Sequence, residues 1–212
     1  MKKISLTTLK RVTGALSFRI HNPKVALHGK GIVNRIHCEC RGENNSLYIE
    51  GGASLTRCRL IFKGNNNTVR VKSGTHLRNI TFWCEGGVNK IEIGRMVTMG
   101  DNVELAACEG KTIVIGDDSM FSHDIAFRTT DSHSIIDAQG RRLNMAKDIV
   151  VGKHVWIGLE SLILKGCTIP DNCIVGAKSL VSASLDVKAN SIIAGNPAKV
   201  IKENINWCRK LL

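Results

Sequence analysis

An isoleucine or valine returns at every sixth position over a long stretch of the C-terminal half of this chain. The series has eight members: Val151, Ile157, Ile163, Ile169, Val175, Val181, Val187 and Ile193. A helix repeats every 3.6 residues and a single strand every two, so neither element explains a period of six. A fixed repeat of this kind predicts that the chain stacks many similar short coils on one another.

The same repeat continues toward the N-terminus, with longer intervals between its triplets. The triplets are Ile49, Leu55 and Ile61; Val71, Leu77 and Trp83; Ile93, Met99 and Leu105; and Ile115, Phe121 and Phe127. Their first members are 22 residues apart, and the residues left over after three hexads coincide with Gly and Asn clusters. Gly and Asn tolerate the left-handed backbone of sharp corners. Three short strands per turn therefore predict an all-β triangular prism of about seven coils.

The repeat divides the chain into one main domain and two ends. We expect an N-terminal cap and an irregular first coil over residues 1–45, followed by a coiled body over residues 46–197. After Pro197 the repeat stops, and residues 198–212 are predicted to form a short amphipathic helix. Terminal caps of this kind are typical of stacked repeats, whose end coils would otherwise expose their cores.

The repeat is interrupted once, in the C-terminal half. The interval between Phe127 and Val151 exceeds one hexad by 18 residues. Residues 128–148 are therefore predicted to leave the body as a loop, because a stacked coil has no room for them. Long loops on rigid scaffolds often carry function, so this loop is the first place to look for a site.

The composition narrows the classes of partner. The chain carries 30 Lys and Arg against 18 Asp and Glu, a net charge of +12, which favours anionic partners such as a phosphate-bearing cofactor or an acidic polysaccharide. Aromatic residues make up only 4%, too few for a base-stacking surface, so we expect no nucleic-acid partner. No stretch has the length and apolarity of a signal peptide or a membrane span, and the eight cysteines form no CxxC pair. These features predict a cytoplasmic protein without disulfides, metal site or transmembrane segment.

Two segments resemble the hexapeptide-repeat acyltransferases, namely residues 151–158 (VGKHVWIG) and residues 194–202 (AGNPAKVIK). Within that family, residues 121–123 (FSH) and 129–133 (TTDSH), followed by a basic loop, resemble the O-acetyltransferases of bacterial surface polysaccharides, among them the polysialic acid O-acetyltransferases of capsules. The resemblance implies a left-handed parallel β-helix that works as a homotrimer. It also implies that acetyl-CoA binds in a groove between neighbouring prisms and gives its acetyl group to a carbohydrate hydroxyl.

The resemblance assigns the role of catalytic base to His133, in the loop. A hydroxyl is a poor nucleophile near neutral pH, so a positioned imidazole must take its proton in the transition state. Asp131 lies two residues earlier and shares a face with His133 on an extended segment. Either its carboxylate or a backbone carbonyl can orient the ring, whereas Ser132 points away, which argues against a Ser-His nucleophile pair. Trp156 matches the position at which related enzymes keep an aromatic beside the thioester, where an indole offers a flat wall and one N–H donor.

The acetyl-CoA contacts also follow from the resemblance, and the acceptor contacts follow from the charge of the loop residues. The acetyl-CoA contacts are assigned to small residues that allow close approach, to one hydroxyl and to two lysines that suit phosphates, namely Gly158, Ala177, Ser182, Gly195, Lys199 and Lys202. The contacts to an acidic acceptor are assigned to Asp131 and to the basic residues Arg128, Arg141, Arg142 and Lys147. Because Cys167 and Cys173 occupy inward positions of the repeat, we expect no covalent acyl-enzyme and predict direct transfer in a ternary complex.

Three other functions fit parts of the sequence. Relatives that N-acetylate an amino sugar, free or nucleotide-linked, often carry an N-terminal nucleotide-binding domain, and no strand followed by GxGxxG occurs here. Some trimeric β-helices hold zinc with three histidines, but His123, His133 and His154 are not spaced by whole coils. A non-enzymatic β-helix binding protein is the third alternative, which the loop histidine and the C-terminal segment disfavour.

Overall fold

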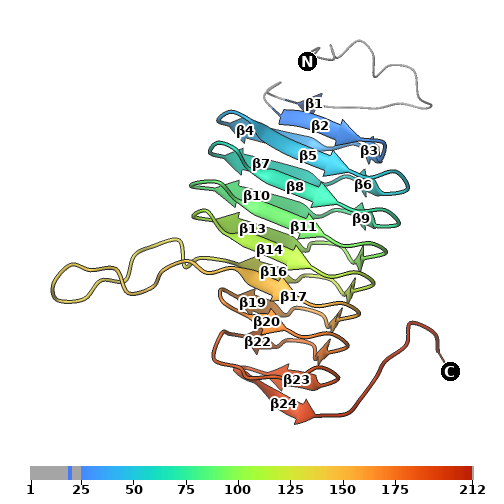
Figure 1. The fold of residues 1–212 in the computed structure, drawn as a ribbon, viewed down its shortest axis with the longest axis vertical. Coiled ribbons are helices and arrows are strands. Elements are labelled where there is room, and N and C mark those ends of the chain that lie inside the picture. Colours follow the sequence, from blue (N-terminus) through green and yellow to red (C-terminus); the bar gives the residue numbers. More distant parts are fainter. Residues whose placement is uncertain (1–18, 21–24, 212) are drawn as a thin grey trace.

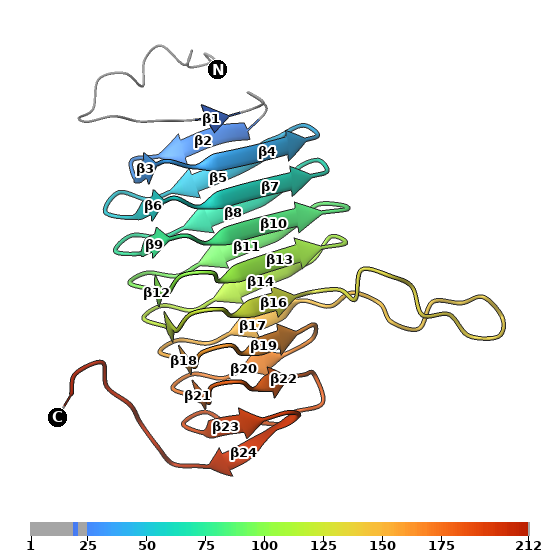
Figure 2. The ribbon, with the colours of Figure 1, turned by 180° about the vertical axis from the view of Figure 1, so that it is seen from behind.

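The six-residue repeat winds the chain into a three-sided coil. The computed structural model describes residues 19–20 and 25–211, which form 24 short strands in three sheets and about eight turns (Figures 1 and 2). Each turn contributes one strand to each sheet, so that sequence neighbours lie on different faces and successive coils pair in parallel. The part of the chain that the structure describes contains no helix, and therefore none that could cross a membrane.

The strands of each sheet follow one another from coil to coil. The first sheet holds β1 (Arg19–Ile20), β4 (His37–Arg41), β7 (Arg59–Lys63), β10 (Thr81–Glu85), β13 (Glu104–Cys108), β16 (Ala126–Arg128), β19 (Leu162–Leu164) and β22 (Leu180–Val181). The second sheet holds β2 (Val25–Gly29), β5 (Asn45–Ile49), β8 (Thr68–Val71), β11 (Lys90–Ile93), β14 (Thr112–Ile115), β17 (Ile149–Val151) and β20 (Thr168–Ile169). The third sheet holds β3 (Ile32–Asn34), β6 (Ser54–Thr56), β9 (His76–Arg78), β12 (Thr98–Met99), β15 (Met120–Phe121), β18 (Trp156–Ile157), β21 (Ile174–Val175), β23 (Ile192–Gly195) and β24 (Ala198–Lys202).

The coil is left-handed. In Figure 1 the strands of the second sheet cross the front from left to right, and in the reverse view of Figure 2 those of the first sheet do the same. Since the chain descends from the N-terminal to the C-terminal end, this sense of rotation is a left-handed winding. The predicted left-handed parallel β-helix is confirmed.

Side chains alternate between the interior and the surface along each strand. In β10 the interior positions are Phe82 and Cys84, both fully buried, and Phe82 lies beside Leu60 and Leu105 of the neighbouring coils. Stacking similar side chains in this way produces one hydrophobic core along the length of the prism. The outer faces are left for polar side chains and for a site.

The six-residue repeat predicts that Ile61 and Trp83 point into the interior, and this prediction is wrong by one residue for both. The interior row of the first sheet passes through Leu60 and Phe82, so Ile61 and Trp83 lie on its outer face. In these coils only five residues, rather than six, separate the interior positions of the third and first sheets. Trp83 is consequently half-buried on the surface instead of filling the core.

The predicted C-terminal helix is also wrong. Residues Ala198–Lys202 form β24, which turns back and pairs antiparallel with β23 to close the last coil. Val200 packs against the core whereas Ile201 is 63% exposed, an alternation that belongs to a strand. Residues 203–211 continue as an irregular tail (Figure 2).

Regular coils begin earlier than predicted. Strands β2, β3 and β4 pair in register with β5, β6 and β7, so residues 25–41 already form a complete turn. With this additional turn the prism has about eight turns, whereas the sequence predicted about seven. The rest of the predicted N-terminal cap, residues 1–18 and 21–24, lies outside the described residues.

Candidate active site

A long loop leaves the prism between β16 on the first sheet and β17 on the second, and extends far from the body (Figures 1 and 2). Its neck is closed by backbone hydrogen bonds. The buried Thr129 donates its amide to the Ala106 carbonyl at 3.2 Å, and Lys147 donates its amide to the Thr129 carbonyl at 3.0 Å. The loop therefore has a fixed root at the corner of the first and second sheets.

The side chain of Asn144 braces the segment around His133. Its amide group donates to the His133 carbonyl and to a carboxylate oxygen of Asp131, both at 2.8 Å. Its carbonyl oxygen accepts the backbone amide of Ile135 at 2.7 Å. The Asp131 carboxylate also pairs with Lys165 on the body. The side chain of Asn144 thus links the returning part of the loop to residues on both sides of His133.

A second brace joins the loop to β13. Arg142 donates two guanidinium hydrogen bonds to the Glu109 carboxylate, at 2.6 and 3.0 Å, and Thr130 bonds the same carboxylate through its hydroxyl. Arg142 and Thr130 hold the pKa of Glu109 below its ordinary value, and Lys165 and Asn144 do the same for Asp131. Both carboxylates are therefore ionised near neutral pH and remain engaged in their ion pairs.

His133 itself is exposed, and its backbone amide donates to the Asp131 carbonyl at 2.8 Å. The carboxylate of Asp131 contacts Lys165 and Asn144. These contacts help to hold the loop against the body. His133 is thereby presented to the outside on a segment whose backbone is held in place.

Trp156 lies on β18, on the outer face of the third sheet, where 39% of it is exposed. The C-terminal tail builds a wall beside it. The indole of Trp207 stacks on His154 with ring centroids 4.0 Å apart, and its centroid lies 6.0 Å from that of Trp156. The Trp207 N–H donates to the His154 carbonyl at 2.8 Å, and Arg209 pairs with Asp118 at 3.0 Å. The tail is thus held against the third sheet, and Trp156 is left partly open.

The two residues predicted to act together are not brought together within one chain. The loop that carries His133 leaves at the corner of the first and second sheets, whereas Trp156 faces outward from the third sheet. In a three-sided prism that corner is opposite the third sheet, as Figure 2 shows for the loop and β18. A site that uses both side chains therefore needs a second copy of the chain.

The residues assigned to acetyl-CoA fall into two groups. Gly158, Ala177 and Gly195 lie on successive coils at the corner of the third and first sheets, where Ala177 and Gly195 are exposed. A Cβ added at Gly158 would lie 2.6 Å from the Ala177 amide nitrogen, so the coils can stack this closely only with glycine there. Lys199 and Lys202 are exposed on β24 below this corner.

Ser182 is separate from this corner. It follows β22 at the far end of the first sheet, and its hydroxyl lies 2.9 Å from that of Ser184. At the corner of the third and first sheets itself, Leu159 directly follows Gly158 and is 37% exposed. Beside it, an ion pair joins Glu160 to Lys178 at 3.4 Å. The corner therefore presents a narrow strip of small residues between an apolar and a charged edge.

The three arginines assigned to the acceptor all have acidic partners. Arg128 pairs with Glu104, Arg141 pairs with Asp137 at 2.7 Å, and Arg142 pairs with Glu109. Arg141 is the most exposed of these, with 77% of its side chain accessible, and Arg142 is the least, with 25%. Arg142 thus serves the bracing of the loop, whereas Arg128 and Arg141 keep exposed faces on which an anion can bind.

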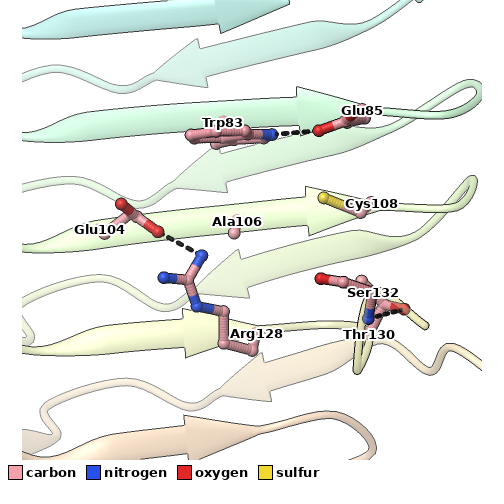
Figure 3. Close-up of a pocket in the computed structure, with 8 residues that line it drawn as sticks. All are labelled: Trp83, Glu85, Glu104, Ala106, Cys108, Arg128, Thr130 and Ser132. Atoms are coloured by element: carbon pink, nitrogen blue, oxygen red, sulfur yellow. Dashed lines mark hydrogen bonds and ion pairs between the residues drawn. The ribbon is translucent and has the colours of Figure 1, made fainter. Parts of the chain in front are cut away.

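A pocket of ≈ 300 Å³ lies at the foot of the loop, on the outer face of the first sheet (Figure 3). It is lined by Trp83, Glu85, Glu104, Ala106, Cys108, Arg128, Thr130 and Ser132. Ser132 directly precedes His133, so the pocket opens next to the segment that carries the histidine. Burial raises the pKa of the Cys108 thiol to about 11, which makes it a poor nucleophile near neutral pH.

Sequence reasoning missed several of these residues. Asn144, Lys165 and Glu109 lie in different parts of the chain and meet only when the loop folds back on the body. Trp83 was assigned to the core because its spacing fitted the repeat. Among the described residues no group of three or more His, Cys, Asp or Glu side chains is arranged to hold a metal ion.

Comparison with known proteins gives relatives that are named acetyltransferases. No protein-family model matches it. It is 36% identical over 122 residues to a polysialic acid O-acetyltransferase of Escherichia coli O1:K1, covering 57% of this chain and 39% of that protein. It is 35% identical over 122 residues to the polysialic acid O-acetyltransferase of Neisseria meningitidis, covering 57% of this chain and 56% of that protein. The chain thus spans about half the length of the curated relatives it matches.

Among solved structures, the polySia-specific acetyltransferase NeuO superposes with a TM-score of 0.78 at 30% identity, covering 89% of this chain and 84% of that one. The chain belongs to the hexapeptide-repeat acyltransferase family. As a hexapeptide-repeat acyltransferase it carries the left-handed coil and the two segments on which the resemblance was based, 151–158 and 194–202.

Proposed function

We propose that this hexapeptide-repeat acyltransferase transfers an acetyl group from acetyl-CoA to a hydroxyl of a bacterial surface carbohydrate. The acceptor we propose is an acidic glycan such as a sialic acid polymer. The observation that carries the proposal is the exposed His133 on a braced loop, in a chain that superposes on a polySia-specific acetyltransferase over 89% of its length. The names of the two curated relatives support the same reaction and acceptor.

In this reaction the acceptor oxygen attacks the thioester carbonyl carbon while an imidazole nitrogen of His133 takes the hydroxyl proton. The C–O bond forms, the C–S bond breaks, and the proton passes from His133 to the departing sulfur. Transfer is direct, in a ternary complex, because the buried thiols are poor nucleophiles. Burial raises the pKa of Cys167 to about 11 and also raises that of Cys173.

We propose a homotrimer in which neighbouring copies complete each site. Since one chain holds His133 and Trp156 on opposite sides of the prism, the loop of one copy has to reach the third sheet of the next. Acetyl-CoA then lies along the adjoining corner at Gly158, Ala177 and Gly195, with Lys199 and Lys202 available to its phosphates. This assembly is the one that the family resemblance implies.

We propose that the enzyme acts in the cytoplasm. All eight cysteines lie among the described residues, and none of them forms a disulfide. Free cysteines suit a reducing compartment. The donor and the acceptor have to be present on the same side of the membrane for transfer to occur.

The test is thiol release from acetyl-CoA in the presence of sialic, uronic and neutral glycans. The wild type is expected to release thiol with an acidic glycan and to leave an acetyl group that mild base removes, as esters require. His133→Ala should slow turnover by about 10²–10⁴-fold, the usual contribution of a general base, while the KM for acetyl-CoA stays unchanged. His37→Ala, which removes an exposed histidine far from the loop, is the control. Full activity of His133→Ala, or no thiol release with any glycan, would show the proposal to be wrong.

A further inference from the structure

The pocket at the foot of the loop exists because of one small residue. Trp83, Ala106 and Arg128 occupy the same row on the outer face of adjacent strands β10, β13 and β16. The row continues with Ile61 above and Leu164 below. Ala106 is the smallest member of this row, and it forms the buried floor of the pocket between the indole of Trp83 and the guanidinium of Arg128 (Figure 3).

The aromatic wall of the pocket is held in place. The Trp83 N–H donates to the Glu85 carboxylate at 2.9 Å, and the Lys63 ammonium sits over the ring, 4.3 Å from its centroid. Lys63 in turn pairs with Glu85 at 3.6 Å. A fixed indole loses little conformational freedom when a ligand packs on it, which favours binding.

The other walls present hydrogen-bonding groups of both kinds. Glu85 and Glu104 supply carboxylate acceptors, Arg128 supplies N–H donors, and Thr130 and Ser132 supply hydroxyls. The pocket volume of ≈ 300 Å³ is at the small end of ligand sites, about 300–1,000 Å³. This combination of one flat apolar wall and several convergent polar groups suits a single sugar ring, which has apolar C–H faces and an edge of hydroxyls.

We propose that this pocket is a binding subsite for one sugar residue of the acceptor glycan, stacked on Trp83 and hydrogen-bonded to Glu104 and Arg128. The residue to be acetylated then lies farther along the chain, at His133, which follows the pocket residue Ser132 directly. This inference rests on the proposed function for the identity of the glycan. It adds a role for Trp83 and Ala106, which the family resemblance does not assign.

Two substitutions test the subsite from opposite directions. Trp83→Ala removes the platform, and Ala106→Leu fills the hollow with the residue type found at Leu164 of the same row. Tyr48→Ala is the matched control, because Tyr48 is also a half-buried aromatic with a cation over its ring, Arg70 at 4.6 Å, but lies on the second sheet. Unfolding midpoints of all four proteins establish that the variants are folded.

Glycan binding is measured by calorimetry without acetyl-CoA, and the KM values for glycan and acetyl-CoA are measured in turnover. Trp83→Ala and Ala106→Leu should each weaken glycan binding and raise the glycan KM about ten-fold, as loss of an aromatic contact does, and leave the acetyl-CoA KM and the Tyr48→Ala values unchanged. Unchanged glycan binding in both folded variants would overturn the subsite while the transfer reaction stands. Glycan binding that depends on Trp83 without any acetyl transfer would support the subsite and overturn the proposed function. Absence of glycan binding by the wild type would overturn both.

Discussion

Coils before the loop and coils after it differ at one corner. Before the loop, Ile93 pairs with Ile115, so a turn takes 22 residues, whereas after it Val151 pairs with Ile169 and a turn takes 18. The extra residues of the longer coils lie between the first and second sheets, and the loop of His133 leaves at the same corner. The loop is therefore an enlarged version of a corner that is already long in the preceding coils, and it marks the change to the shorter coils.

The long corners are held by a ladder of buried asparagines. The side-chain oxygen of Asn45 accepts the backbone and side-chain N–H groups of Asn67, both at 2.9 Å. Asn67 accepts from Asn89 in the same way, and Asn89 accepts the Lys111 amide at 3.0 Å. At the next coil Asp148, at the end of the loop, takes over by accepting the Thr112 amide at 2.7 Å. The corner thus changes from a buried structural ladder to a braced, exposed functional loop.

The ladder should dominate the stability of the long coils. Asn67→Ala removes the oxygen that accepts the buried Asn89 backbone amide and one of the two donors to the Asn45 oxygen. A buried polar group left unpaired costs about 1–3 kcal/mol. We expect the free energy of unfolding, measured with denaturant, to fall by about 3 kcal/mol. Asn65→Ala in the same corner is the control, since Asn65 accepts only the Glu43 amide near the surface and should cost under about 1 kcal/mol. Equal losses for the two variants would contradict the role of the ladder.

Substitutions in the braced loop should change the catalytic rate and leave the stability of the fold unchanged. Asn144→Ala removes the hydrogen bonds to Asp131, His133 and Ile135. Because the base is then less well positioned, we expect kcat to fall about ten-fold, with the acetyl-CoA KM and the unfolding midpoint unchanged. Gln139→Ala, an amide at the exposed tip of the same loop, should retain the wild-type kcat. A normal kcat in Asn144→Ala would show that the brace does not position His133.

The smallest expected effect is an opening of the loop at acidic pH. The pKa values of Glu109 and Asp131 lie below their ordinary values of 4.5 and 3.8, owing first to Arg142 and Lys165 respectively. At a pH above the ordinary pKa values, the ionised carboxylates stabilise the closed neck of the loop. This stabilisation is lost as the pH falls through the lowered pKa values of the folded protein. Amide hydrogen exchange over residues 133–144, corrected for intrinsic rates, should be constant at neutral and mildly acidic pH and rise a few-fold below about pH 4.

Glu109→Gln provides the control for this titration. Its loop should exchange faster at every pH, and its acid rise should be smaller because only Asp131 remains to be protonated. A wild-type exchange rate that stays constant down to acid unfolding would rule out the two carboxylates as the fastening of the loop.

The sequence repeat predicted the architecture because the fold is a direct consequence of periodic burial. Val151 through Ile193 recur in step with the coils, and the excess between Phe127 and Val151 predicted the loop. Trp83 lies on the outer face because five residues, rather than six, separate the interior positions Leu77 and Phe82, and a shift of one residue moves a side chain to the other face. The sequence does not distinguish a strand from a helix at Ala198–Lys202, because a short apolar segment fits either period. The contacts of Asn144 and Lys165 depend on the path of the loop in space, which no local pattern encodes.

In the proposed trimer, His133 of one copy works with Trp156 of another. The direct measurement is the acetyl-transfer rate of assemblies co-expressed from His133→Ala and Trp156→Ala chains, each of which should be nearly inactive alone. In a symmetric trimer with sites between copies, about one site in four of a random mixture combines an intact His133 with an intact Trp156. The mixture is therefore expected to recover about a quarter of the wild-type rate per site. A mixture no more active than either variant alone would contradict this arrangement.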